Sequence, residues 1–474
     1  MRLMLVLTFV ACSAVGVQNP IQPVANPPID PNAPQVVTKK LLEFGWDKPR
    51  PGLLTTARLE GSVFDGVVFR PTPGDTIIRP DLIPASDFET DIADLQKIKS
   101  KKLENSFYLL TVNAKTWDWF DDATWNSAEA NLAQMARVAK AGGLRGILFD
   151  PEVYDFDLWA YRSQPRKAAY TFAQFESQLR QRGASLMRAY EREYPGITLL
   201  MLFSFPAFEL PKDPTYETAH AELENDGSLG LFASFLEGML SAASEQARFI
   251  DGNEPSYYHL RPTDFDAART VSLQPNQVLI APELRAKFGR LFRFSNAIYV
   301  DGAMNLWGSA RFFGYYQTSD ANRRDLLVQN VFHGLRTADE FVWVYAENID
   351  WWKRTAQNTD FAVLEATFKR AQLEFSRGAL TRDPSAALMT AETAFNARVN
   401  VGGDILGKAG LRVNFGALSP HCATWNNAQR WSCTQPGGSS FVVTPTAPNT
   451  IFTPGSMNFT ALTKDNWNSH FSVK

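Results

Sequence analysis

The sequence contains few of the residues that form metal sites or activated nucleophiles. Among its 474 residues are 5 histidines and 3 cysteines, and the histidines all lie outside the segments that we predict to be strands, which disfavours a metal-dependent hydrolase. The sequence also lacks a Gly-x-Ser-x-Gly motif and a complete glycine-rich phosphate loop, which argues against a serine hydrolase and against nucleotide cofactors. We therefore expect no metal and no cofactor.

An excess of charge of one sign is also lacking, since 47 basic and 50 acidic residues give a net charge of −3. This balance argues against nucleic acid or an anionic membrane surface as the main partner. No apolar run beyond the N-terminus is long enough to cross a bilayer.

The N-terminus resembles an export signal, because a basic residue precedes a short apolar run, residues 3–10, and small residues follow. We expect residues 1–16 to be a signal peptide and the mature protein to lie outside the cytoplasm, secreted or periplasmic. Two ways of processing stay open. One is cleavage after Gly16, and the other is a lipoprotein anchored at Cys12, because residues 9–12 resemble a bacterial lipobox. A lipid on Cys12 would then be the link to the membrane.

Three further regions follow the signal. Residues 17–38 are rich in Pro and Asn and have no means of burying a core, so we expect a linker. Residues 39–380 alternate apolar and amphipathic segments and form the main domain. Residues 381–474 are rich in Asn, Thr, Ser, Gly and Pro, which indicates a small β-rich region that covers the main domain or binds carbohydrate. In an oxidising compartment, Cys422 and Cys433 could close a small loop there.

Eight short apolar segments of the main domain are predicted to be β-strands, and helical patterns follow most of them. The predicted strands cover residues 41–47, 64–69, 107–112, 146–149, 197–205, 248–254, 297–301 and 340–347. Alternating strands and helices in this number predict the α/β class, with a (β/α)8 TIM-type barrel and a small C-terminal β-rich appendage.

The C-terminal ends of the strands of such a barrel meet at one rim, where catalytic residues are found. Acids stand at several of these ends: Asp150 and Glu152 follow the fourth strand, Asp251 and Glu254 the sixth, and Glu347 the eighth. Cleavage of a glycosidic bond needs two carboxyl groups, one to protonate the leaving oxygen and one to attack the sugar or activate water. The rim therefore offers the residues for this chemistry.

Three segments make the rim resemble that of (β/α)8-barrel glycoside hydrolases: Phe-Asp-Pro-Glu-Val-Tyr at 149–154, Phe-Ile-Asp-Gly-Asn-Glu at 249–254 and Trp-Val-Tyr-Ala-Glu-Asn at 343–348. The resemblance covers about residues 41–377 and is to this class of enzymes, with no single family indicated. It implies hydrolysis of a poly- or oligosaccharide, with Asp150 or Glu152 as one catalytic partner and Asp251 or Glu254 as the other. Glu347 is a further catalytic candidate, although its place on the eighth strand departs from the commonest patterns.

Aromatic rings and polar groups near the rim are expected to bind the carbohydrate, since flat rings match the apolar faces of sugars while amides and carboxyls bond their hydroxyls. The substrate-binding candidates are Trp46, Asp47, Asn113, Trp117, Tyr154, Tyr257, Asp301, Trp307, Asn348 and Trp351.

The acids also have structural alternatives. Asp150 could serve only as an acceptor of hydrogen bonds at the rim, Asp251 could cap a turn, and Glu347 could pair with a nearby arginine. A calcium ion could instead be gathered by the oxygens of Asp150, Glu152, Asp155 and Asp157. If the acids do not pair across a cleft, the alternative function is a non-catalytic surface protein that binds a polysaccharide on the same barrel.

Overall fold

The structure is a computed structural model that describes residues 38–382, except 46, 75–76, 113, 115, 154–155, 206–213, 225–228, 274, 309–311, 313, 315–316 and 318, together with 397–402, 412–414, 431–435, 440–459, 466–470 and 472–473. The expected signal peptide, Cys12, most of the linker and Cys422 lie outside these residues. None of the helices within them combines the length and the apolar character needed to span a bilayer.

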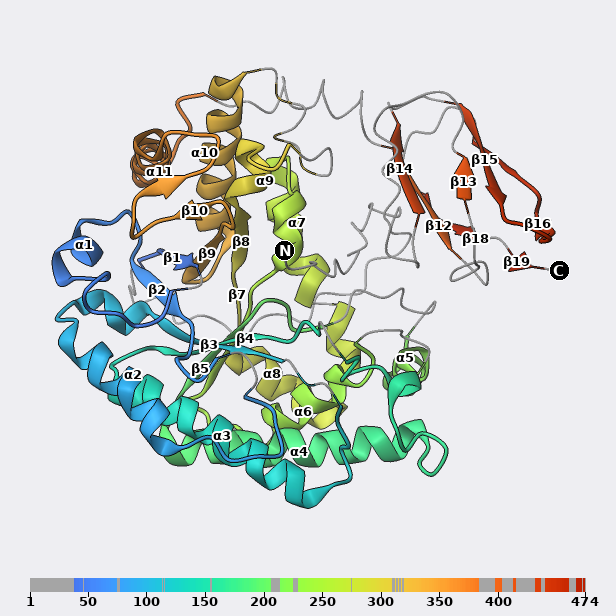
Figure 1. The fold of residues 1–474 in the computed structure, drawn as a ribbon, viewed down its shortest axis with the longest axis horizontal. Coiled ribbons are helices and arrows are strands. Elements are labelled where there is room, and N and C mark those ends of the chain that lie inside the picture. The colour runs from blue at the N-terminus through green and yellow to red at the C-terminus, as the bar shows by residue number, and fades with distance from the viewer. Residues whose placement is uncertain are drawn as a thin grey trace.

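A parallel sheet of nine strands forms the centre of the main domain, and its neighbours along the sheet are β7-β6-β5-β4-β3-β2-β1-β9-β8 (Figure 1). The strands are β1 (Lys40–Phe44), β2 (Gly66–Phe69), β3 (Phe107–Thr111), β4 (Gly146–Asp150), β5 (Thr198–Met201), β6 (Arg248–Asp251), β7 (Phe292–Phe294), β8 (Asn296–Tyr299) and β9 (Phe341–Tyr345). Since β7 and β8 are separated along the chain by one residue, they share one position, and nine strands fill eight positions (9 − 1 = 8).

Ser295, between β7 and β8, joins the two edges of the sheet. Its backbone N–H donates to the carbonyl oxygen of Asp251 in β6 at 2.7 Å, and its hydroxyl donates to the carbonyl oxygen of Phe341 in β9 at 2.7 Å. The sheet is thereby closed into a barrel, and the predicted (β/α)8 architecture is confirmed.

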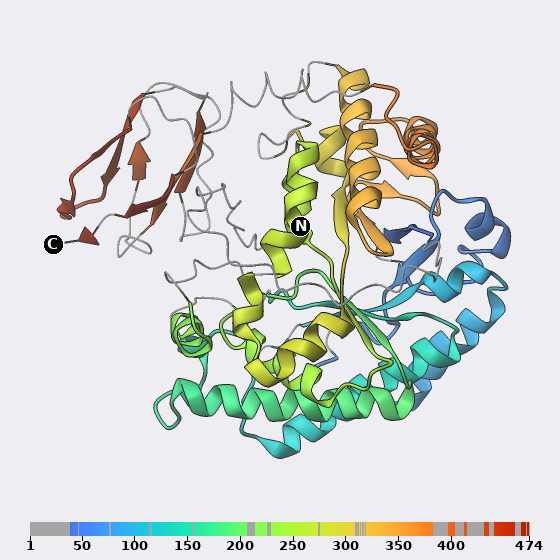
Figure 2. The same cartoon turned by 180° about the vertical axis from the view of Figure 1, so that it is seen from behind.

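Helices surround the barrel on its outer side, as the view from behind also shows (Figure 2). The α-helices are α1 (Thr56–Gly61), α2 (Ala85–Lys97), α3 (Asp122–Ala141), α4 (Phe172–Glu193), α5 (Tyr216–Leu223), α6 (Phe232–Ala242), α7 (Pro262–Leu273), α8 (Arg285–Leu291), α9 (Val300–Met304), α10 (Asp320–Thr337) and α11 (Phe361–Ser376). Short 3-10 helices, among them η1 (Lys101–Asn105) and η3 (Glu254–Tyr258), lie in the connections.

Two elements differ from the expectation in ways that affect the site. The seventh strand ends at Tyr299, and Asp301 lies in the first turn of α9 instead of at a strand tip. The sequence after the sixth predicted strand indicates an irregular, aromatic loop, but this stretch contains helix α7. Its start is fixed by the Asp264 carboxylate, which accepts the N–H groups of Leu260 and Arg261 at 2.9 and 2.8 Å, as N-terminal capping groups do.

The side chain of Trp343 closes the interior of the barrel. The residue is fully buried, and its indole N–H crosses from β9 to the end of β6, where it donates to the carbonyl oxygen of Gly252 at 2.8 Å. A side chain at position 252 is excluded, because a Cβ there would lie 2.2 Å from the carbonyl oxygen of Met201 and 2.9 Å from the Trp343 nitrogen. Trp343 therefore forms the floor of any site at the rim.

The C-terminal region consists of short strands in three small sheets, drawn in red in Figure 1. The pairing is antiparallel except between β12 and β18, in agreement with the expected β-rich appendage. Its strands are β12 (Ala397–Gly402), β13 (Arg412–Asn414), β14 (Trp431–Gln435), β15 (Phe441–Thr446), β16 (Phe452–Thr453), β17 (Met457–Phe459), β18 (Asn466–His470) and β19 (Ser472–Val473).

Candidate active site

Two of the rim acids, Asp150 and Asp251, form turns directly after their strands. The Asp150 carboxylate accepts the backbone N–H of Glu152 at 2.9 Å, and the Asp251 carboxylate accepts that of Asn253 at 2.8 Å. Burial raises the pKa of Asp251 to about 6, although hydrogen bonds from Asn253 and Ser204 lower it. Each carboxylate thus fixes the turn that carries the next glutamate. This agrees with the structural alternatives for these acids, in which Asp150 accepts hydrogen bonds at the rim and Asp251 caps a turn.

Those next glutamates, Glu152 and Glu254, border the same tyrosine. Both are buried, with 7% and 8% of their surface exposed, and the negative charges of both contribute to a pKa of Tyr257 well above its ordinary value. Burial is the largest cause of that shift, followed by the charge of Glu254 and then by Tyr345, Tyr299 and Glu152. Glutamates that follow β4 and β6 therefore both act electrostatically on one buried phenol.

Three tyrosines line the mouth of the barrel above the floor. The ring of Tyr257 lies edge-on to Trp343 at 5.4 Å between centroids, 5.1 Å from the ring of Tyr299 and 6.3 Å from that of Tyr345. Burial also raises the pKa of Tyr299, so Tyr257 and Tyr299 remain neutral and can donate hydrogen bonds at neutral pH.

Glu347 and Trp307 extend the site outward from Tyr299. The Tyr299 hydroxyl donates to the Glu347 carboxylate at 3.2 Å and accepts the Trp307 indole N–H at 2.8 Å. Trp307 is 53% exposed, so one face of its ring is open to solvent. Burial raises the pKa of Glu347, against the opposing effect of the bond from Tyr299.

Asp301 holds the backbone on which Glu347 stands. It is fully buried and accepts the N–H groups of Glu347 and Asn348 at 2.5 and 3.2 Å. Burial raises its pKa to about 6, and these backbone bonds lower it. Asp301 and the buried Asn348, both expected to bind substrate, thus lie beside Glu347, and Asp301 positions the loop.

Asp47 lies in a second acidic group, with Glu43 and Asp350. Burial and then the charge of Asp47 raise the pKa of Glu43 well above its ordinary value, while a bond from the Trp352 indole N–H at 3.3 Å lowers it. Burial and then Asp350 raise the pKa of Asp47 to about 6. No pattern in the sequence singles out Glu43, because only the fold brings Trp352 against it.

Two of the expected sugar-binding aromatics lie in the core. Trp117 is 3% exposed and packs edge-on against Trp119 and Trp125 at 5.8 and 6.4 Å. Trp351 is 6% exposed and packs between Phe64 and aromatic side chains of α11. A ring enclosed in this way offers no face to a sugar. The remaining candidates Trp46, Asn113 and Tyr154 lie outside the described residues.

Within the described part of the chain, no group of three or more His, Cys, Asp or Glu side chains is placed to hold a metal ion. The calcium alternative therefore gains no support from Asp150, Glu152 and Asp157, and Asp155 lies outside that part.

Sequence reasoning missed Trp343, Tyr345 and Tyr299 as components of the site. The alternation of Phe-Val-Trp-Val-Tyr in β9 places Trp343 and Tyr345 on one face of the strand, and this was the available signal. The contacts of Trp343 and Tyr345 with Phe44 and Tyr257 show that this face of β9 points into the barrel. The sequence alone does not indicate which face is the inner one.

No family model matches the chain, and no curated protein matches it. Among solved structures, it is similar to the exo-β-1,4-mannosidase Op5Man5 from Opitutaceae bacterium strain TAV5, with 14% identity and a TM-score of 0.37 over 72% of this chain and 60% of that one. It is also similar to a putative sugar phosphate isomerase/epimerase from Anabaena variabilis, with 13% identity and a TM-score of 0.36 over 72% and 99% of the two chains. A chitinase from Chromobacterium violaceum has 13% identity and a TM-score of 0.33 over 71% and 99%. The chain thus spans less than two thirds of the mannosidase, and the assignment of the barrel rests on its own strand order.

Proposed function

We propose that the protein hydrolyses a glycosidic bond of a poly- or oligosaccharide at the C-terminal rim of the barrel, outside the cytoplasm where its N-terminal sequence would direct it. The observation that carries the proposal is that the buried Glu152 and Glu254 both act electrostatically on Tyr257, whose ring packs on the Trp343 floor. Glycosidic hydrolysis requires two carboxyl groups, and here they follow two different strands at the same end of the barrel.

In this proposal Glu152 and Glu254 form the catalytic pair, one as the general acid and the other as the nucleophile or base. The neutral phenol of Tyr257 lies beside both and can donate a hydrogen bond to whichever is ionised, which stabilises negative charge there. Because Asp150 and Asp251 are bonded to the turns that follow them, they act as positioning residues.

The exposed face of Trp307 and the carboxylate of Glu347 would bind the sugar next to the bond that is cleaved. An indole stacks on the apolar face of a pyranose, and a carboxylate accepts hydrogen bonds from its hydroxyls. The link through Tyr299 keeps the two at fixed positions.

The test is a screen of the full chain against a panel of polysaccharides, with release of reducing ends as the readout. Glu152→Gln and Glu254→Gln should each lower kcat by about 10²- to 10⁴-fold on the substrate found. The control is Glu104→Gln, which removes an exposed carboxylate from η1, an element that leads into the opposite end of β3. The anomeric configuration of the first product, followed by NMR, distinguishes a retaining from an inverting reaction.

The alternative function is a non-catalytic protein that binds a polysaccharide. The exposed ring of Trp307 supports it, because binding to that ring would not require Glu152 or Glu254. Saturable binding without turnover, unchanged by Glu152→Gln and Glu254→Gln but weakened by Trp307→Ala, would establish that alternative and refute the hydrolase.

A further inference from the structure

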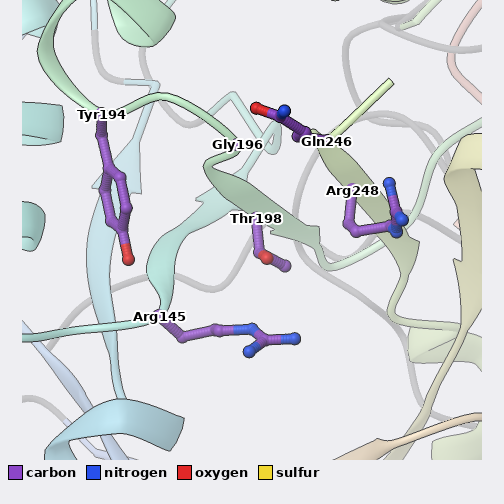
Figure 3. Close-up of a pocket in the computed structure, with 6 residues that line it drawn as sticks. All are labelled: Arg145, Tyr194, Gly196, Thr198, Gln246 and Arg248. Carbon is purple, nitrogen blue, oxygen red and sulfur yellow. The ribbon is translucent and has the colours of Figure 1, made fainter. Parts of the chain in front are cut away.

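A basic pocket lies at the end of the barrel opposite the acidic rim (Figure 3). It has a volume of about 260 Å³ and is lined by residues where β4, β5 and β6 begin: Arg145, Tyr194, Gly196, Thr198, Gln246 and Arg248. At about 30 Å³ per water molecule, this volume corresponds to roughly nine waters. The pocket is therefore large enough for a small ion with part of its hydration shell.

The two guanidinium groups of the pocket retain donors for a ligand. Both hydrogen bonds of Arg248 to described residues use Nη1, which donates to the carbonyl oxygens of Glu245 and Ala247 at 2.8 and 2.6 Å. The planar edge formed by Nε and Nη2 is thus left for a bidentate contact. Arg145 binds Glu340 through Nη2 at 3.3 Å, and its Nε is buried without an acceptor among the described residues.

Positive charge exceeds negative charge around the pocket. The charged side chains that interact at this end, in the part of the chain that the structure describes, are Arg145, Arg248, Arg269, Arg290, Arg293, Lys39 and Lys287 against Glu245, Asp339 and Glu340, which gives 7 − 3 = +4. Burial lowers the pKa of Arg293, Asp339 opposes this effect, and the cations Arg248 and Arg269 lower the pKa further. An anion in the pocket would relieve this repulsion.

We propose that this pocket binds a small tetrahedral oxyanion of the size of phosphate or sulfate. The Nε and Nη2 groups of Arg248 would hold two of its oxygens, because this edge matches the spacing of oxygens in such anions. Arg145 and the hydroxyl of Thr198, which face the same space in Figure 3, would supply further donors. The site is independent of the proposed hydrolysis, since it lies at the other end of the barrel.

The test is isothermal titration of the full chain with sodium phosphate and with sodium sulfate, at constant ionic strength set by chloride. Arg248→Gln should weaken binding at least about tenfold through the loss of charge-assisted bonds. The matched control is Arg293→Gln, because Nη1 of Arg293 donates in the same pattern to the carbonyl oxygens three and one residues earlier, at 3.0 and 2.7 Å, while Arg293 does not line the pocket. That variant should change affinity less than about threefold, through screened charge alone.

Thr198→Val provides a second variant that preserves shape if Arg248→Gln does not fold, and it should weaken binding severalfold. Saturable binding that Arg248→Gln or Thr198→Val removes and Arg293→Gln retains supports the site. The proposal is overturned if neither anion binds saturably above the chloride background, or if Arg293→Gln weakens binding as much as the pocket variants do.

Discussion

Replacement of Trp343 by Phe tests whether the indole bond across the barrel stabilises the fold. The substitution removes the N–H that reaches the Gly252 carbonyl oxygen at 2.8 Å. An orphaned buried carbonyl costs about 1–3 kcal/mol, and the smaller ring leaves a void that costs roughly 1–2 kcal/mol more, a fraction of the loss for Trp→Ala. The free energy of unfolding should therefore fall by about 2–5 kcal/mol, measured from the urea midpoint at unchanged slope.

Trp351→Phe is the matched control. Trp351 is also buried, but its indole N–H has no acceptor among the described residues. The same loss of ring volume is then offset by removal of an unpaired buried donor, which itself costs about 1–3 kcal/mol. We expect this variant to differ from the original protein by less than about 1 kcal/mol. Equal destabilisation by the two substitutions would show that the bond to Gly252 contributes nothing.

Three further predictions concern the rim. Because burial raises the pKa of Asp251 from 3.8 to about 6, its contribution to stability is present below about pH 4 and lost as pH rises through about 6. The difference in unfolding free energy between the original protein and Asp251→Asn, measured by urea titration, should thus fall by up to about 3 kcal/mol from pH 4 to above pH 6. A difference that does not change with pH would contradict the buried position of Asp251. Trp307→Ala should raise KM a few-fold to about tenfold with kcat retained, and Trp307→Phe should restore most of the loss, because the ring stacks on the sugar; a fall in kcat alone contradicts that role. Glu347→Gln should lower kcat less than Glu152→Gln or Glu254→Gln does, and the reverse order in initial-rate assays would make Glu347 a member of the catalytic pair.

The barrel could be predicted from the sequence because its strands are apolar runs bounded by breakers. The run at 146–149 ends at Asp150 and Pro151, and the observed strand is Gly146–Asp150. The helical pattern predicts a start of α3 near residue 127, whereas the helix begins at Asp122, because the Asp121 carboxylate caps the N–H groups of Ala123 and Thr124 at 3.0 and 3.2 Å before the apolar periodicity begins.

The rim acids could be placed near the site but could not be sorted by role. Whether a strand-end carboxylate faces a cavity or its own turn depends on the backbone after the strand. Asp150 and Asp251 both accept the N–H group two residues later, although one is followed by Pro151 and the other by Gly252. Aromatic residues in loops were ambiguous for a related reason. Trp351 is enclosed by Phe64 and Phe368, at 4.8 and 5.5 Å, and contacts between segments so distant along the chain leave no local signal.

The basic pocket makes the two ends of the barrel differ in charge. The carboxyl groups named above follow the strands at the rim, while the guanidinium groups of the pocket lie where the strands begin, so these two sets of charges stand at opposite ends of the barrel although the net charge is only −3. A body with charges separated in this way orients near a charged surface before it touches it. Near an anionic surface, these charges would favour an orientation in which the basic end faces the surface and the rim faces away from it.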